Sequence, residues 1–440
     1  MNHNEAIDYI HSTYKFGSKL GLENISELMN KLDNPQNRLK FIHVAGTNGK
    51  GSTCVMLSYV LKEAGYRTGL FISPYLESFS ERIQIDNMPI ANEDLALSVS
   101  TVKNAIDMMV KEGKSHPTEF EVVTATAMVY YCLKAVDIVI LEVGMGGRLD
   151  ATNIIEAPEI VVITSISNDH SEYLGDTLEK IAYEKASIIK ENCDVVIYPQ
   201  KETVYEVIKQ FAVEKSAIIH PVAIEDMSIV SFGAHGQKLL YNNKLTNTGI
   251  MEFSLNLIGS HQAVNCLTVL KTIEVLIDKG YTINTSHIIR AFGTVTFNGR
   301  MEILKRKPLI IIDGAHNSDG LERLAENIAA YFKSYNVHLF FGMLADKEIH
   351  TSLKILLNYC SDVVTLTPDN PRAKPAQDTA DMIKEISSIQ VAVCDDIAQS
   401  VNYIQTGSKD VNLFCGSLYL IGNIRALINS QEQHGHISST

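Results

Sequence analysis

Short apolar runs, each followed by a turn and a helical pattern, constrain the fold of this 440-residue chain more than any other feature. Uninterrupted runs of this length suit strands buried on both faces of a parallel sheet, and intervening helices suggest βαβ units. The runs before residue 200 are FIHVAG, TGLFIS, VDIVILEVG, EIVVITSI and CDVVIY. Those after residue 308 are LIIIDGAHN, HLFFGM, DVVTL, QVAV and VNLFCGS. The pattern predicts an α/β fold with two domains.

The break between the two series of runs predicts the domain boundary. The segment AFGTVTFNGRMEILKRKP follows a long helical stretch and precedes the second series. We therefore expect an N-terminal domain over 1–296 with a parallel-sheet core, and a Rossmann-like α/β domain over 297–440. Residues 218–257 are poorer in helix signals, so we expect them to form β-hairpins appended to the first domain.

Charge and cysteine content exclude several classes of protein. The net charge of −13 argues against nucleic acid as a partner, because a phosphate backbone needs a basic surface. The seven cysteines are odd in number and form no C-x-x-C pair, which fits a reducing compartment. The N-terminus lacks an apolar signal core, and no apolar run reaches the roughly 18 residues that span a bilayer. We expect a cytoplasmic protein that binds neither nucleic acid nor membranes.

Residues 46–53, GTNGKGST, have the context of a phosphate-binding loop, because a strand precedes them and a helix follows. Glycines let backbone N–H groups face phosphates, and the helix N-terminus adds partial positive charge. Lys50 would then contact the β- and γ-phosphates. The residues expected to bind ATP here are Thr47, Asn48, Gly49, Lys50, Gly51 and Ser52. The helix should place Met56, Val60 and Ala64 on one apolar face and end at Gly65.

The loop departs from its common form at one position. A Ser or Thr usually follows the lysine and holds Mg²⁺, but Gly51 stands here and Ser52 comes one residue late. In an open parallel sheet, ligands gather at the carboxyl ends of the strands, where Ser73, Glu142 and His170 all lie. Because Mg²⁺ prefers oxygen ligands, Ser73 and Glu142 are natural candidates, and His170 is the less usual one. Each alone could be a capping residue, and a metal role for Ser52 stays open.

Nine motifs occur along the chain in a fixed order: HVAGTNGKGS, SPYLESFSERI, LEVGMGGRLDATN, NDHSEYLG, EKASIIK, GSHQAVN, GRME, DGAHN and GSLYLIG. In this order they resemble folylpolyglutamate synthase, often bifunctional with dihydrofolate synthase, in the ATP-dependent Mur ligase superfamily. The resemblance implies that ATP phosphorylates a substrate carboxylate and that the amine of L-glutamate attacks the acyl phosphate. It implies ATP and two Mg²⁺ ions as cofactors, a folate or dihydropteroate and L-glutamate as partners, and a monomer. It leaves open whether dihydrofolate is also made.

The resemblance also assigns roles to individual residues. The magnesium ligands that it implies are Ser73, Glu142, His170 and Lys185, the last as a carbamate. Without the family, Lys185 would be interpreted as a solvated helix lysine. The catalytic residues that it implies are Lys50, Lys185 and His316. Further ATP contacts would come from Asn265, Arg300 and Asp313, so that ATP would lie between the two domains and domain closure would assemble the site.

The substrate-side residues follow from the same resemblance. Those expected to bind the folate or pteroate are Thr118, Glu119, Phe120, Glu121, Leu149, Asp150 and Ala151. Arg372 and Ser417 are candidates on the glutamate side. The family usually has His where Tyr75 stands, and commonly has Pro where Asn298 and Ser318 stand. None of these departures removes a metal or phosphate group, although Tyr75 changes the expected pterin contacts.

Two other functions remain as alternatives. Another Mur-type amino-acid ligase would generally carry an extra N-terminal domain of roughly 100 residues. Since 45 residues precede the loop, we favour a folate substrate. A P-loop ATPase switch would hydrolyse ATP without an amino acid and would need a partner surface. The metal-ligand candidates and the second α/β domain favour a ligase.

Overall fold

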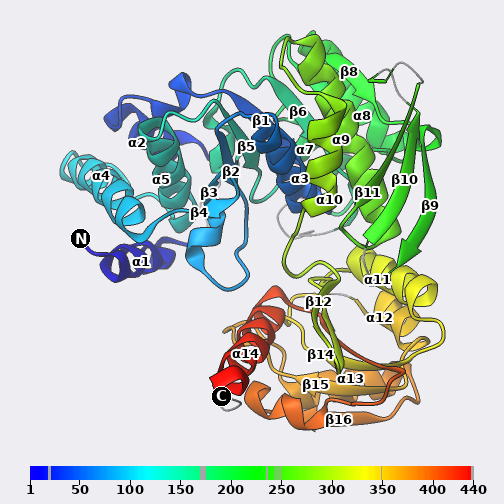
Figure 1. The fold of residues 1–440 in the computed structure, drawn as a ribbon. Coiled ribbons are helices and arrows are strands. Elements are labelled where there is room, and N and C mark those ends of the chain that lie inside the picture. The colour runs from blue at the N-terminus through cyan, green and yellow to red at the C-terminus, as the bar shows by residue number, and fades with distance from the viewer. Residues whose placement is uncertain are drawn as a thin grey trace. The chain divides into compact units, whose positions relative to one another are not determined.

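The computed structural model describes residues 1–17, 21–168, 175–233, 236–242, 245–246, 249–347 and 349–437. The chain forms two compact units (Figure 1). The first comprises Met1–Ile229, Leu239–Leu255 and Gln262–Val295, and the second comprises Val230–Lys238, Asn256–His261 and Thr296–Thr440. The main boundary differs by one residue from that of the expected domains, 1–296 and 297–440. In addition, Val230–Lys238 and Asn256–His261 belong to the second unit, although they lie within the expected first domain.

An eight-stranded sheet forms the centre of the first unit. Its strands lie in the order β4 (Met88–Pro89), β3 (Ile83–Ile85), β2 (Thr68–Phe71), β5 (Ile138–Glu142), β1 (Phe41–Ala45), β6 (Ile160–Ile163), β7 (Asp194–Ile197) and β8 (Ile218–Pro221). The neighbouring strands β2, β5, β1, β6, β7 and β8 pair in parallel. Strand β3 pairs antiparallel with both β2 and β4. Every residue of β1, β2, β5 and β6 is buried, as expected for apolar strands covered on both faces. The α/β class predicted from these runs is confirmed.

The helices of the first unit form separate groups (Figure 1). They are α1 (His3–Ser12), α2 (Glu23–Lys31), α3 (Lys50–Glu63), α4 (Asn92–Lys111), α5 (Glu119–Leu133), α7 (Leu178–Ala186), α8 (Glu202–Glu214), α9 (Ser260–Asp278) and α10 (Thr285–Thr294). Helices α1, α2, α4 and α5 share a hydrophobic cluster with Phe41 and Phe71 of the sheet. Helices α7 and α8 share another cluster with Val161 and Val195.

Helix α3 differs from its prediction in one respect. It ends as expected, because Gly65 adopts φ +90° just beyond the helix. The expectation of a single apolar face is wrong, since every residue from Ser52 to Ser58 is buried. The reason is tertiary: α3 packs against β1, β2 and β5 and also against α10, so most of its circumference is covered.

Residues 218–257 contain the strands that their sequence predicts, but in two different sheets. Strands β9 (Met227–Gly233), β10 (Gly236–Asn242) and β11 (Ile250–Leu255) form a three-stranded sheet in the order β11-β10-β9. Strand β8, in the same segment, instead pairs in parallel with β7 at the edge of the main sheet. Hairpins therefore account for only part of this segment.

The second unit is built on a six-stranded sheet. Its strands lie in the order β12 (Glu302–Arg306), β13 (Leu309–Ile312), β17 (Asp410–Cys415), β14 (Asn336–Phe341), β15 (Asp362–Leu366) and β16 (Val391–Cys394). Strand β12 is antiparallel to β13, and the other neighbours pair in parallel. Its helices are α11 (Ser318–Tyr331), α12 (His350–Leu357), α13 (Ala376–Ile386) and α14 (Leu418–Ile437). All five runs predicted after residue 308 are strands of this sheet.

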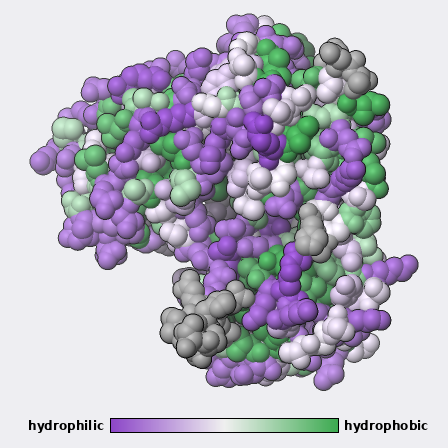
Figure 2. Space-filling model, viewed as in Figure 1, coloured by the Kyte–Doolittle hydropathy of each residue, from purple (hydrophilic) through white to green (hydrophobic). Residues whose placement is uncertain are grey.

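No helix in the described part of the chain is long and apolar enough to cross a membrane. Hydrophilic residues cover much of the face seen in Figure 2. All seven cysteines are unpaired thiols, as their number and spacing predict.

Candidate active site

The glycines of the phosphate loop allow two close backbone approaches. Gly46 and Gly49 adopt φ values of +155° and +84°, which L side chains rarely adopt. A Cβ on Gly46 would lie 1.8 Å from Thr164 Oγ1, and one on Gly49 would lie 2.5 Å from Asn265 Oδ1. Gly49 is also the N-cap of α3 and supplies no capping side chain. The N-terminus of α3 therefore has no side-chain cap, which suits the binding of an anion.

The segment after β6 holds the loop in place. The Thr47 N–H donates to the Ser165 carbonyl at 2.7 Å, and the Thr47 hydroxyl donates to the Ser167 carbonyl at 3.0 Å. The hydroxyls of Thr164 and Ser165 both donate to the Asn48 carbonyl, at 2.9 and 3.1 Å. These hydrogen bonds between the loop and the segment after β6 fix the conformation of the loop.

Two lysines meet at one carbonyl of this loop. Lys50 Nζ donates to the carbonyls of Gly46 and Thr47, at 3.0 and 3.1 Å. Lys185 Nζ, from α7, donates to the same Gly46 carbonyl at 2.7 Å. The structure therefore brings together the P-loop lysine and the lysine that the family resemblance singled out.

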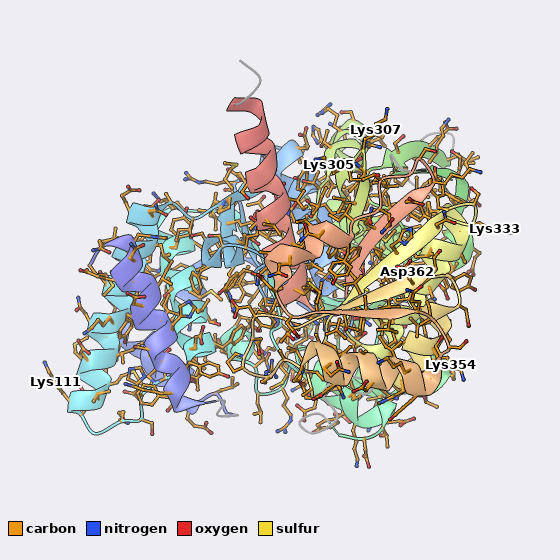
Figure 3. All side chains as sticks on the ribbon, turned by 90° about the horizontal axis from the view of Figure 1, so that it is seen from below. Lys111, Lys305, Lys307, Lys333, Lys354 and Asp362 are labelled. Atoms are coloured by element: carbon orange, nitrogen blue, oxygen red, sulfur yellow. The ribbon has the colours of Figure 1, made fainter. Side chains whose placement is uncertain are left out.

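Lys185 differs from most lysines of the chain in its burial. Lys111, Lys333 and Lys354 are exposed and project outward in Figure 3. Lys185 is 4% exposed, although a lysine is seldom buried without a partner or a function. The interpretation of Lys185 as a solvated helix lysine is wrong.

Ser73 and Glu142 lie together at the carboxyl edge of the sheet. The Ser73 N–H donates to Glu142 Oε2 at 3.0 Å, and Glu142 is 4% exposed. Burial raises the pKa of the Cys54 thiol of α3, the Glu142 carboxylate raises it further, and the Lys50 ammonium lowers it. Glu142 pairs in register with Val44 of β1, two residues before the phosphate loop begins.

A magnesium ion suits the chemistry of this corner. Glu142 offers carboxylate oxygens and Ser73 a hydroxyl oxygen, which are the donors that Mg²⁺ prefers. His170, the third expected ligand, lies outside the described residues. Within the described ranges, no group of three or more His, Cys, Asp or Glu side chains gathers as a metal site. The oxygen donors present fit a magnesium ion, and a complete shell needs further ligands.

Helix α9 reaches the loop through two amide side chains. Gln262 Nε2 donates to the Ser52 hydroxyl at 3.1 Å, and Asn265 Nδ2 donates to Gln262 Oε1 at 3.1 Å. Asn265 was expected at the ATP site and does lie against Gly49. Gln262 was missed, although its i, i+3 spacing from Asn265 puts both on one helix face. The Ser52 hydroxyl is buried and serves this contact.

The expected folate segment around α5 begins with a helix cap. Glu121 Oε2 accepts hydrogen bonds from the N–H and the hydroxyl of Thr118, at 2.7 and 2.9 Å. These two residues form a capping box, so the structure gives them a local role. The neighbouring residue Glu119 contacts α1, with its Oε1 atom 3.4 Å from His11 Nδ1.

Phe120 joins this segment to the other expected substrate residues. Its ring lies so close to Gly144 that a Cβ there would be 2.5 Å from Phe120 Cζ. The Phe120 ring also lies 6.0 Å from that of Phe71, at the end of β2. Two segments far apart in sequence, 118–121 and 142–151, therefore meet beside the strand that leads to Ser73.

Asp150 organises the loop that follows β5. Its Oδ2 accepts the Met145 N–H at 2.8 Å, and its Oδ1 accepts the N–H and the hydroxyl of Thr152 at 3.0 and 2.6 Å. Burial raises the pKa of Asp150, and the hydrogen bonds from Thr152 oppose that change. Its neighbours differ in burial: Leu149 is partly exposed and Ala151 is buried.

The same loop is tied to the helix that carries Lys185. The Arg148 N–H donates to the Glu184 carbonyl at 2.9 Å, and Arg148 Nε lies 3.0 Å from Glu184 Oε1. A Cβ on Gly147 would lie 2.6 Å from the Glu184 carbonyl oxygen. The expected substrate loop and the expected carbamate lysine thus belong to one packed assembly.

In the second unit, Asp313 and Arg300 lie together after β13. Asp313 accepts the N–H groups of Met301 and Ala315, at 2.8 and 2.9 Å. Burial raises the pKa of Asp313, and the Arg300 guanidinium lowers it. A Cβ on Gly314 would lie 1.9 Å from Arg300 Nη1, so only glycine leaves room for that guanidinium. The structure brings together two of the expected ATP contacts.

The remaining candidates follow the strands of the same sheet. His316 Nδ1 lies 2.8 Å from the Gly314 carbonyl, which fixes its proton on Nδ1. Ser417 follows β17, is 2% exposed and accepts the Tyr419 N–H at 3.2 Å. Arg372 is exposed, with Nη1 3.8 Å from Asp346 Oδ2. Since β13, β17 and β14 are adjacent and parallel, the segments following them lie at one carboxyl edge.

Comparison with known proteins agrees with this arrangement. Residues 44–273 match the Mur ligase middle domain, and residues 299–418 match the Mur ligase, glutamate ligase domain. The chain is 35% identical over 430 residues to the dihydrofolate synthase/folylpolyglutamate synthase of Bacillus subtilis strain 168, covering 96% of this chain and 98% of that protein. The chain belongs to the folylpolyglutamate synthase/dihydrofolate synthase family of Mur ligases.

Solved structures extend this family relationship to the whole fold. The folylpolyglutamate synthase of Mycobacterium tuberculosis, complexed with ADP and AMPPCP, is similar with a TM-score of 0.88 and 28% identity, over 97% of this chain and 99% of that one. Escherichia coli FolC, in complex with DHPP and ADP, is similar with a TM-score of 0.83 and 27% identity, over 97% and 98% of the two chains. The family and the ligase class indicated by the motifs are confirmed.

Proposed function

We propose that this chain adds L-glutamate to a folate in an ATP-dependent reaction that passes through an acyl phosphate. The family membership supports the ligase chemistry, and the names of the relatives support the substrate class. The E. coli relative in complex with DHPP and ADP supports an adenine nucleotide, and the structure of E. coli FolC without folate substrate supports a folate. Addition of glutamate to dihydropteroate, which forms dihydrofolate, is part of the proposal.

The observation that carries the proposal is the convergence of Lys50 and buried Lys185 on the Gly46 carbonyl. In the reaction, an oxygen of the substrate carboxylate attacks the γ-phosphorus of ATP, and the bond to ADP breaks. The glutamate amine then attacks the acyl carbon, loses a proton, and phosphate leaves. Adjacent phosphate and carboxylate anions repel one another, so Lys50 and the N-terminus of α3 stabilise both the bound and the transferring phosphate.

We assign the metal and nucleotide contacts on the same basis. Ser73, Glu142 and His170 would hold a magnesium ion, and a carbamate on Lys185 would hold a second one. These ions would supply neutralising positive charge. The loop residues 47–52 and Asn265 would bind ATP in the first unit, supported by their contacts around Gly49. Arg300 and Asp313 would do so from the second unit.

The remaining assignments rest on the family resemblance together with local geometry. His316 would act in catalysis, with its proton on Nδ1. Arg372 and Ser417 would bind the incoming glutamate, supported by their position after strands of one sheet edge. The proposal includes domains 1–296 and 297–440, a monomer, and a cytoplasmic location, which the seven unpaired thiols favour.

The proposal is tested by incubating the purified protein with ATP, Mg²⁺ and L-glutamate, adding dihydropteroate or a reduced folate in separate reactions. Phosphate release and product mass are measured together. We expect phosphate release that depends on both glutamate and the pterin, with a product heavier by one glutamate. Release that needs no pterin substrate would refute the folate assignment. Release that needs no amino acid would favour an ATPase switch.

A further inference from the structure

A histidine stands in the middle of the buried strand β1. His43 is 0% exposed, and so are its neighbours Ile42 and Val44. Burial lowers the pKa of His43 to about 3, and the positive charge of Lys190 acts in the same direction. The imidazole is therefore neutral, and one of its nitrogens carries the proton.

The hydrogen bonds around His43 identify that nitrogen. His43 Nε2 lies 3.0 Å from Thr152 Oγ1, and the Thr152 hydroxyl donates to Asp150 Oδ1 at 2.6 Å. Because a hydroxyl has one proton and Thr152 gives it to Asp150, its oxygen must accept from His43. His43 is therefore protonated on Nε2, and its Nδ1 has no hydrogen-bond partner in the described part of the chain.

Stability does not explain a histidine at this position. A buried nitrogen without a partner costs free energy, whereas an apolar side chain of similar size would bury no polar group. The other residues of β1 are apolar and fully or almost fully buried. The polar chain from His43 through Thr152 ends at Asp150, a residue expected at the pterin site.

We propose that His43 is a positioning residue for the pterin substrate, acting through Thr152 to fix the carboxylate of Asp150. The inference rests on the proposed function. The Asp150 carboxylate is held by hydrogen bonds from Met145 and Thr152, and the backbone of Gly144 adds a further one. The orientation of this carboxylate then decides whether it can share a hydrogen bond with an N–H group of a pterin ring. His43 fixes the rotation of the Thr152 hydroxyl and so fixes that orientation.

The proposal is tested with the full-length protein and whichever pterin substrate the wild type glutamylates. The variants are His43→Leu, Thr152→Val, the double variant, and His43→Gln, whose side-chain amide N–H can replace the Nε2–H donor. We expect each of the first two to raise KM for the pterin about five- to tenfold, the usual effect of losing one hydrogen bond, with kcat almost unchanged. The double variant should resemble the single ones, because the residues act in one chain. His43→Gln should restore most of the wild-type KM.

Two controls separate positioning from a structural effect. Thr272→Val removes an equally buried hydroxyl that donates to the Thr268 carbonyl at 2.8 Å on α9, and it should leave KM for the pterin unchanged. The melting temperature of His43→Leu should equal or exceed that of the wild type. An unchanged KM in His43→Leu would overturn the proposal. So would a double variant whose effect is the product of the single effects, or a His43→Gln variant no better than His43→Leu. Failure of the proposed function is a different result: the wild type itself would add glutamate to no pterin substrate.

Discussion

Replacing Gly49 with alanine tests the geometry of the phosphate loop more directly than any other single change. Gly49 has φ +84° and ψ −10°, a left-handed conformation that costs an L residue about 1–2 kcal/mol. The new methyl group would also lie 2.5 Å from Asn265 Oδ1, so the Asn265 side chain must move. Its hydrogen bond to Gln262 then weakens, which costs about 1 kcal/mol more.

The two effects together amount to about 2–3 kcal/mol, which corresponds to a loss of about 30- to 150-fold in ATP affinity if the strain falls on the loop. Isothermal titration calorimetry with a non-hydrolysable ATP analogue measures this directly. Gly65→Ala is the matched control, because Gly65 has φ +90° with no atom within 4 Å of the new methyl group. This substitution introduces the same backbone strain without a close contact of the methyl group. It also lies at the opposite end of α3 from the phosphate loop. We expect it to lower the melting temperature slightly and to leave ATP affinity unchanged.

Wild-type affinity in Gly49→Ala would refute the reasoning, because it would mean that the loop binds phosphate without this backbone geometry. Equal losses in Gly49→Ala and Gly65→Ala would show that the effect arises from destabilised α3 and not from the contact with Asn265.

Three further predictions concern single side chains. Lys185→Ala should lose at least about 100-fold in activity and regain part of it with added short-chain acids that mimic a carbamate. Lys180→Ala, on the same helix, should keep its activity. Full activity of Lys185→Ala in a glutamylation assay would contradict this prediction. The pKa of His43 is lowered to about 3, so the unfolded chain binds an extra proton between about pH 6.5 and 3, and stability falls as pH falls through that window. His43→Leu should remove up to about 1.4 kcal/mol per pH unit of that slope, measured as melting temperature against pH, and parallel curves would contradict the prediction. Arg372→Ala should raise KM for glutamate about tenfold and leave KM for ATP unchanged. The control Lys354→Ala should leave both constants unchanged. A parallel rise of both constants in Arg372→Ala would argue against a glutamate contact.

The sequence predicted those parts of the fold that depend on burial along a single strand. Runs such as FIHVA and VDIVIL are apolar at every position because both faces of their strands are covered, and that property is visible without tertiary information. The burial of α3 was not predictable in this way. It depends on α10, which begins at Thr285, more than 200 residues later in the chain. The pairing of β8 with β7 was also not predictable. The residues of β8 are exposed or only partly buried, so they form no fully buried apolar run.

The same distinction applies to the residues of the candidate site. The proximity of Ser73 and Glu142 was predictable because the carboxyl ends of neighbouring parallel strands meet, which is a rule of topology. The contacts of Gln262 with Ser52 and of His43 with Thr152 were not predictable in this way, because each joins residues that lie far apart in the sequence. The capping box of Thr118 and Glu121 was present in the sequence as T-x-x-E, and it shows that two of the expected substrate residues also have a local structural role.

The two lysines at Gly46 connect the geometry to the chemistry of Lys185. Both Nζ atoms lie within hydrogen-bonding distance of one carbonyl oxygen, so they lie close to each other. Two positive charges about 5 Å apart repel by about 3 kcal/mol at an effective dielectric constant of about 20. A carbamate on Lys185 would be negatively charged, and the same proximity to Lys50 would then attract. The burial of Lys185 strengthens either interaction, since water screens a buried pair less than an exposed one. This proximity would therefore favour a carbamate on Lys185 over the free lysine. The same argument predicts that Lys50→Met lowers the extent of carbamylation measured by mass or by ¹³C-bicarbonate labelling. An equal extent of carbamylation in that variant would show that Lys50 does not promote the modification.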